Sequence, residues 1–323
     1  IAPSTGYSAA VAKQKTELEF SLIDGVSKGM SAIFKGMTDI GVSIQKVTGF
    51  AGDLSNALGG VNLLAPLQAI PAALVDLESA MSRAGQATGA TVEQLKQLTD
   101  VAQEAGTATG FTAVEAAGGL EALGRAGLNA TEAMAALTPV LALAKVANIE
   151  VQDAAGRVAD TLDQFGLAAG KAASVADVLA AAASASGTNL KHLSDGLTQA
   201  GPVARTVGLS FETTAAALGL LAKNGIEGGK AGGSLRVILE ALADPTSKFS
   251  AALTDAGIKS RDFATVLTEL SRKGAAGEAA IQSLGAKGTA AVQALLREGG
   301  GALQKFTTEI KNSEDAALRA AKL

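Results

Sequence analysis

Apolar residues in the N-terminal part of the chain recur at alternating steps of three and four positions, from Ile23 to Val61. An average step of 3.5 places them in a narrow stripe on one side of an α-helix, which is the pattern of a coiled coil. The stripe lasts for roughly five heptads and predicts a helix over 22–61, with a stripe about 57 Å long. The apolar positions are Ile23, Val26, Met30, Ile33, Met37, Ile40, Ile44, Val47, Ala51, Leu54, Leu58 and Val61.

An apolar stripe of this length cannot cover itself, so the helix needs a partner. Six glycines also lie within it, and each costs about 1 kcal/mol relative to alanine in an exposed helix. The helix is therefore expected to form only when it is packed. The pattern favours self-association of several copies along the stripe, and the alternative is an ordinary helix of an intramolecular bundle. The glycines are Gly25, Gly29, Gly36, Gly41, Gly49 and Gly52.

The most apolar stretch of the chain runs from Val61 to Val75 and contains Pro66 and Pro71. It is shorter than the ~20 residues that span a bilayer, and its prolines interrupt a helix. We predict a buried bend between helices, within a connector over 62–77. Insertion of this segment into a membrane is the alternative.

Glycines followed by one large aliphatic residue punctuate the rest of the chain. A glycine in the left-handed conformation, followed by a hydrophobic residue that folds back on the last turn, is a Schellman helix stop. Helix starts follow the same logic, because Thr91 and Thr112 each precede Gln or Glu by three positions, as in a capping box. The predicted stops are Gly127, Gly166, Gly208, Gly225 and Gly257.

These signals predict an all-α fold, in which a long heptad-patterned helix precedes a compact body of short, glycine-capped helices. No segment shows the alternation of a strand. The intervals between the predicted stops vary, which argues against a solenoid of fixed period. The expected parts are an N-terminal segment over 1–21, the long helix, the connector, a helical core domain over 78–245 and C-terminal helices over 246–323.

The C-terminal part is expected to contain a helix over Glu278–Arg297 and a last helix over Leu303–Leu318. Three consecutive glycines at 299–301 separate them and predict a flexible joint. Residue 1 is Ile rather than Met, and no signal-like segment follows it. We therefore expect the chain to be an internal piece of a longer polypeptide.

The amino-acid composition excludes several common kinds of catalytic and metal-binding site. The chain has no cysteine and one histidine, which excludes disulfides, thiolate catalysis, cysteine metal sites and multi-histidine metal sites. Its 27 basic and 31 acidic residues give a net charge of −4, and no basic tract suits binding to nucleic acid. We predict no cofactor, no metal and no sequence-specific nucleic acid partner.

The segment Gly225–Ser234 has the glycine content of a phosphate-binding loop. Aligned on Gly229-Lys230, however, the pattern puts Asn224 where the first glycine belongs and Ala231 where the magnesium-binding hydroxyl belongs. A helix precedes the segment where the motif needs a strand. We therefore predict a flexible or tightly turned connection before a helix over Ser234–Leu242.

Two further candidates for chemistry have ordinary explanations. His192 is followed by Ser194 and Asp195, but residues two and three positions apart do not form a triad on one helix. An exposed or cap-bonded histidine is the prediction. A set of carboxylates could supply the pair that glycoside hydrolysis needs, although their spacing also fits solvated helix faces. They are Glu121, Glu132, Asp153, Asp160 and Asp163. We predict that the chain is not an enzyme.

About half of the chain, from Glu78 to Asp244, resembles the core domain of phage tail tape measure proteins. The blocks that carry the resemblance include Thr91-x-x-Gln94-Leu95, Thr109-Gly110-Phe111-Thr112-Ala113-x-Glu115, Ala126-Gly127-Leu128-Asn129-Ala130-x-Glu132, Ala200-Gly201-Pro202, Gly208-Leu209-Ser210-x-Glu212, and a distinctive motif. That motif consists of Gly225, Ile226, Gly228, Ala231, Gly232, Leu235 and Arg236. Lys230 and Gly233 depart from it.

The resemblance implies a structural role. Members of this family are expected to set tail length during assembly, to occupy the lumen of the tail tube near the tip or baseplate, and to leave during DNA ejection. It also implies several copies side by side, with a trimer favoured, and contact with tail tube and tip or baseplate proteins. The alternative is a membrane-active, channel-forming module that inserts into the host envelope during ejection.

Overall fold

The computed structural model describes residues 64–312 and Ala317, with side chains from Asp76 onward. The chain divides into two units, Ile1–Leu74 and Val75–Leu323. The predicted segment 1–21 and the long helix over 22–61, with its stripe from Ile23 to Val61, lie outside the described residues. Within the described part every regular element is a helix, so the all-α prediction is confirmed.

The first described helix, α3, runs over Leu64–Thr88. It covers most of the segment 62–77, so the predicted buried bend is wrong from Leu64 onward. The two prolines explain the error in different ways. Pro66 lies in the first turn, where the missing N–H has no helical partner anyway. Pro71 lies further inside the helix, where a proline removes one hydrogen bond without necessarily ending the helix.

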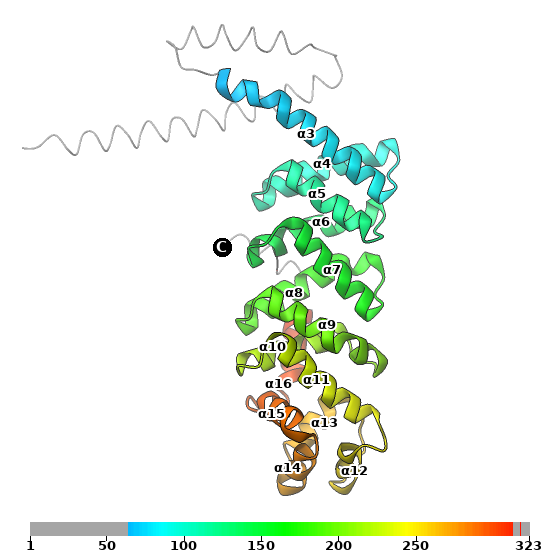
Figure 1. The fold of residues 1–323 in the computed structure, drawn as a ribbon, viewed down its shortest axis with the longest axis vertical. Helices are drawn as coiled ribbons and strands as arrows, with labels where there is room; N and C mark the ends of the chain where they lie inside the picture. The colour runs from blue at the N-terminus through cyan, green and yellow to red at the C-terminus, as the bar shows by residue number, and fades with distance from the viewer. Residues whose placement is uncertain (1–63, 313–316, 318–323) are drawn as a thin grey trace, which may run out of the picture. The chain divides into compact units, whose positions relative to one another are not determined.

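Eight helices then stack in two layers (Figure 1). Each packs against the next helix in the chain and against the next but one, so even-numbered helices form one layer and odd-numbered helices the other. The helices are α4 (Val92–Thr109), α5 (Ala113–Arg125), α6 (Ala130–Ala147), α7 (Val151–Phe165), α8 (Ala172–Ser186), α9 (Leu190–Thr206), α10 (Phe211–Lys223) and α11 (Gly228–Ala243). A short 3-10 helix, Ala169–Lys171, lies between α7 and α8.

The connections between these helices recur at regular intervals. From the connection between α3 and α4 onward, each contains one residue with positive φ, and successive residues of this kind are roughly 20 positions apart, so a helix pair repeats about every 40 residues. The positions are Gly89, Gly110, Gly127, Asn148, Gly166, Gly187, Gly208 and Gly225. This is the spacing of a helix-pair solenoid, and the prediction that no fixed period is present was wrong.

Five shorter helices complete the described chain. They are α12 (Lys248–Asp255), α13 (Phe263–Leu270), α14 (Gly274–Gln282), α15 (Gly285–Leu296) and α16 (Ala302–Lys311). The predicted helix Glu278–Arg297 is thus parts of two helices, because the chain turns after Gln282 and Gly285 takes a φ of 72° at the first position of α15. The predicted last helix Leu303–Leu318 corresponds to α16, which begins one residue earlier and ends at Lys311.

The glycine run at 299–301 is a packed turn rather than an open joint. Gly299 has a φ of 100°, and the carbonyl oxygen of Gly300 accepts a hydrogen bond of 2.7 Å from the Thr268 hydroxyl of α13. The turn directs α16 back along α10 and α8. There Phe306 fills a notch at Gly219, where a Cβ would lie 2.8 Å from the ring, and the ammonium of Lys223 lies 4.6 Å from the ring centroid.

The core consists of small and aliphatic side chains, and nine residues of α6 are buried in it. Among the described residues, α6 alone is long and apolar enough to cross a membrane by length and composition. Leu137, Val140 and Leu141 of α6 are completely buried. Because α6 packs against α4, α5, α7 and α8, burial in the stack accounts for its apolar character.

Candidate functional site

The five predicted stop glycines take up the geometry of helix stops. Their φ angles lie between 60° and 91°. After each glycine, the N–H of the aliphatic residue donates back to the carbonyl oxygen five residues earlier, as Leu128 does to Leu123 at 3.1 Å and Ile226 does to Leu221 at 2.9 Å. Two residues after Gly127, Asn129 caps the next helix in a complete capping box with Glu132. A stop and a start are thus built into one short connection.

The family-like motif lies where α9 and α11 cross. A Cβ on Gly232 would overlap the carbonyl oxygen of Gly196 and would lie 2.8 Å from the Gly196 Cα. The two helices therefore touch through their backbones, which only glycine permits at Gly232. Gly228 takes a φ of 59° at the start of α11, and its Cα faces the His192 ring.

The remaining motif residues serve packing and turn formation. Gly225 and Ile226 form the stop of α10, and Ala231 and Leu235 are buried. Arg236 is exposed, and its Nε lies 2.9 Å from an oxygen of Glu240 one turn later. Because α11 begins at Gly228, the prediction of a flexible or turned segment before Ser234 was wrong. The close contact with Gly196, which is distant in sequence, stabilises this glycine-rich helix turn.

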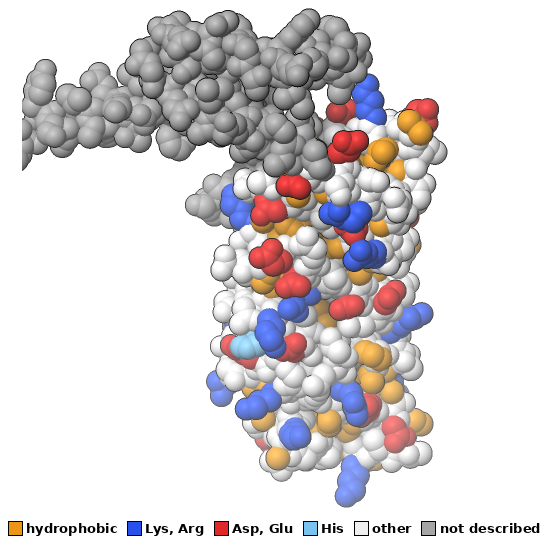
Figure 2. All heavy atoms as spheres, turned by 45° about the horizontal axis from the view of Figure 1, so that its top comes forward, with side chains coloured by type: hydrophobic (Ala, Val, Ile, Leu, Met, Phe, Trp, Pro, Cys, Tyr) orange, Lys and Arg blue, Asp and Glu red, His pale blue; other side chains and the backbone are white. Residues whose placement is uncertain are grey.

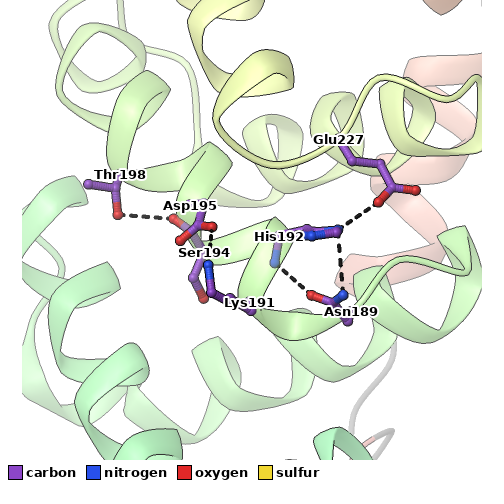
Figure 3. A network of polar contacts seen from close by, with 7 residues as sticks. All are labelled: Asn189, Lys191, His192, Ser194, Asp195, Thr198 and Glu227. Carbon is purple, nitrogen blue, oxygen red and sulfur yellow. Dashed lines mark hydrogen bonds and ion pairs between the residues drawn. The ribbon is translucent and has the colours of Figure 1, made fainter.

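His192 lies in a polar cluster at the start of α9 (Figure 3). Its Nδ1 is 2.6 Å from an oxygen of Glu227, the residue that precedes α11, and its backbone N–H donates to the Asn189 side chain at 2.8 Å. Figure 3 shows the ring pointing toward Glu227 and away from Ser194 and Asp195. The arrangement is a helix start joined to its neighbour, and it is not a catalytic triad.

The candidate carboxylates are already engaged or lie on open surface. Glu121 pairs with Arg83 at 3.1 Å and with Arg125, and Glu132 belongs to a capping box. Asp160 and Asp163 are exposed on α7. Acidic and basic side chains are interspersed over the face seen in Figure 2. Among the residues that the structure describes, no group of three or more histidine or acidic residues could hold a metal ion.

Sequence reasoning missed the residues that reveal the repeat. Gly110 and Gly187 stop helices but precede Phe and Thr, and Asn148 takes a φ of 50° where other connections have glycine. Its neighbour Ile149 donates to Ala144 as the Schellman pattern requires. A search for any Gly followed two positions later by Thr or Asn would have found Gly110 and Gly187, whereas the residue two positions after Asn148 makes no capping hydrogen bond. Gly196 carried no local signal.

The described part of the chain is therefore an all-helical repeat scaffold, in which the stop glycines, the motif residues and His192 contribute to helix packing and capping. A family model described as phage-related minor tail protein matches residues 99–323, and the chain belongs to this family. The match extends beyond the predicted core domain over 78–245 into the C-terminal helices.

Two curated relatives are tape measure proteins. The chain is 36% identical over 201 residues to the tape measure protein of Pneumococcus phage Dp-1, which is 61% of this chain and 18% of that protein. It is 33% identical over 170 residues to the probable tape measure protein of Escherichia phage P2, which is 52% of this chain and 21% of that protein. The match thus spans about a fifth of the length of each relative. No solved structure matches the chain.

Proposed function

We propose that this chain is part of a tape measure protein that sets tail length during assembly. In this proposal it occupies the lumen of the tail tube near the tip or baseplate, contacts tube and tip proteins, and leaves during DNA ejection. The observation that supports it is the similarity of the chain to two tape measure relatives. The role is structural rather than catalytic.

The two parts of the chain would contribute to length very differently. A continuous helix adds about 1.5 Å for each residue, so the proposed rod over 22–61 would act as an efficient ruler. A stacked helix pair uses about 40 residues to add only the 8–10 Å that separates packed helices. The stack therefore suits an end piece or a docking domain, and the rod suits measurement of length.

Tail length in electron micrographs tests the proposal. Duplication of residues 23–57, which form five whole heptads, should lengthen tails by about 50 Å and keeps the heptad pattern in register. Duplication of the helix pair α6–α7 adds a similar number of residues and serves as the matched control, with an expected change of about 10 Å. Unchanged tail length in virions shown to contain the rod duplication contradicts the proposal.

The apolar stripe supports a second element of the proposal, which is side-by-side association of copies, most simply as a trimer. Aspartate at Ile33 and Ile40 would place charges on the stripe and would leave every residue of the stack unchanged. Native mass spectrometry should then show monomers in place of trimers, whereas alanine at Gly36 should leave the oligomer intact. A full chain that is monomeric before any substitution contradicts this element.

A further inference from the structure

The starts of the odd-numbered helices place equivalent residues along one edge of the stack. The residue before each of α5, α7, α9 and α11 is an N-cap, and these four are Thr112, Glu150, Asn189 and Glu227. The third residue within each helix then occupies a second equivalent position. Those residues are Glu115, Asp153, His192 and Lys230. The repeat thus allows one connection to be compared with another.

Between α9 and α11, a basic group and a carboxylate join these two positions. His192, the third residue of α9, lies with its Nδ1 2.6 Å from an oxygen of Glu227, the N-cap of α11. This contact links one helix start to the next (Figure 3). Between α5 and α7 the equivalent residues are Glu115 and Glu150, which are both acidic. Two carboxylates repel each other and cannot make the same link.

A crevice of about 730 Å³ lies where that link is missing. Phe111 and Ile149 supply apolar surface, and Glu115, Glu150 and Asp153 supply carboxylates. Phe111 and Ile149 are each only partly buried, so their apolar surface is open to a ligand. The crevice therefore combines an apolar surface with negative charge at its rim.

The carboxylates of the crevice differ in the hydrogen bonds and ion pairs that they already make. One oxygen of Glu115 accepts hydrogen bonds of 2.7 Å from the backbone N–H and the hydroxyl of Thr112. Glu150 makes no capping hydrogen bond, and no described residue forms an ion pair with Glu150 or Asp153. Lys145 lines the same crevice, with its ammonium near Gly110, and forms no ion pair with these carboxylates within the described residues.

We propose that this crevice binds a lysine or arginine side chain of a partner polypeptide. The cationic group takes the place relative to Glu150 that His192 takes relative to Glu227. The apolar surface of Phe111 and Ile149 packs against the aliphatic stem of that side chain and against an apolar neighbour. Because exposed carboxylates are screened by solvent, the charge contributes mainly orientation and selectivity for a basic segment.

Nuclear magnetic resonance of the isotope-labelled full chain tests this assignment. The probe is an acetylated, amidated pentapeptide with one lysine between two leucines, and its control carries norleucine in place of the lysine. The lysine peptide should shift the amide signals of Gly110 and Asn148 in a saturable manner, and the norleucine peptide should not. Substitution of Glu150→Gln should raise the dissociation constant about threefold.

Asp160→Asn is the matched control, because it removes one negative charge as Glu150→Gln does, but at an exposed position of α7 outside the crevice. Equal weakening by both variants would show general attraction to an acidic surface and would overturn the assignment. Binding only after Lys145→Gln would overturn it too, because Lys145 would then fill the crevice itself. Shifts of the same signals with protein concentration alone would assign the crevice to a second copy and exclude a separate partner.

Discussion

Substitution of Gly232 by alanine tests the close crossing of α9 and α11 directly. The added Cβ would overlap the Gly196 carbonyl oxygen and lie 2.8 Å from the Gly196 Cα. Both of these atoms belong to the backbone, so no side chain can rotate away. The helices must separate, which loosens contacts around the buried Ala200 and Leu235.

The magnitude follows from two opposing effects. Overpacking of a well-packed contact costs about 1–3 kcal/mol. Replacement of a helical glycine by alanine stabilises the folded protein by about 1 kcal/mol, because alanine has the higher helix propensity. The net loss should therefore be at most about 2 kcal/mol, which corresponds to a fall in Tm of at most roughly 6 °C for a body of this size.

Thermal unfolding followed by circular dichroism at 222 nm measures the change, with midpoints compared because a repeat array need not unfold in one step. The matched control is Gly156→Ala in the middle of α7, where a Cβ would meet no atom within 4 Å. This control should gain up to about 1 kcal/mol. A Gly232→Ala protein as stable as the Gly156→Ala protein would refute the backbone contact.

Three other substitutions probe different features. In Gly208→Ala the added Cβ meets no neighbouring atom, but the alanine must adopt a φ of 73°. Urea unfolding should therefore show a free energy of unfolding lower by about 1 kcal/mol, and an unchanged midpoint would contradict the left-handed stop. Phe306→Ala removes the buried ring that packs α16 against Gly219 and should cost about 3 kcal/mol. Hydrogen exchange should become faster in α16 alone, whereas alanine at the exposed Lys305 should leave exchange unchanged. The Thr246 hydroxyl, followed by the Thr246 N–H, lowers the pKa of Asp244, so stability from this contact is present above the unfolded pKa near 3.8 and is lost as pH falls through the lower folded pKa. Thr246→Val should raise the pKa of Asp244 toward 3.8 in a carboxyl-carbon titration, and an unchanged pKa would contradict the hydroxyl's role.

Local chemistry made the helices and many of their ends predictable. A glycine with positive φ and a following aliphatic residue act within six residues, so Gly166 and Gly257 could be recognised as stops without knowledge of the fold. Capping boxes are equally local, and Thr91 and Thr112 begin α4 and α5 as predicted.

The repeat and the crossing of α9 and α11 depend on residues that are far apart in the sequence. The prediction counted only glycines before Leu or Ile, which hid Gly110 and Asn148 and made the spacing look irregular. Gly232 gave the appearance of a loop because its contact, Gly196, is 36 positions away in the chain. The candidate crevice could not be predicted at all, since it appears only when equivalent helix starts are placed side by side.

The order of contacts in the stack has a mechanical consequence. From α4 to α11, neighbours in space are also neighbours along the chain, so tension applied at the N-terminal side would strip the helices one after another without threading. Unfolding from the C-terminal end would not follow this simple order, because α16 packs against α10 and α8, which lie much earlier in the chain. Pulled from its N-terminal side, the stack would therefore unfold one helix at a time while the contacts of α16 still hold α8 and α10 together, which would suit the release from the tail that we propose.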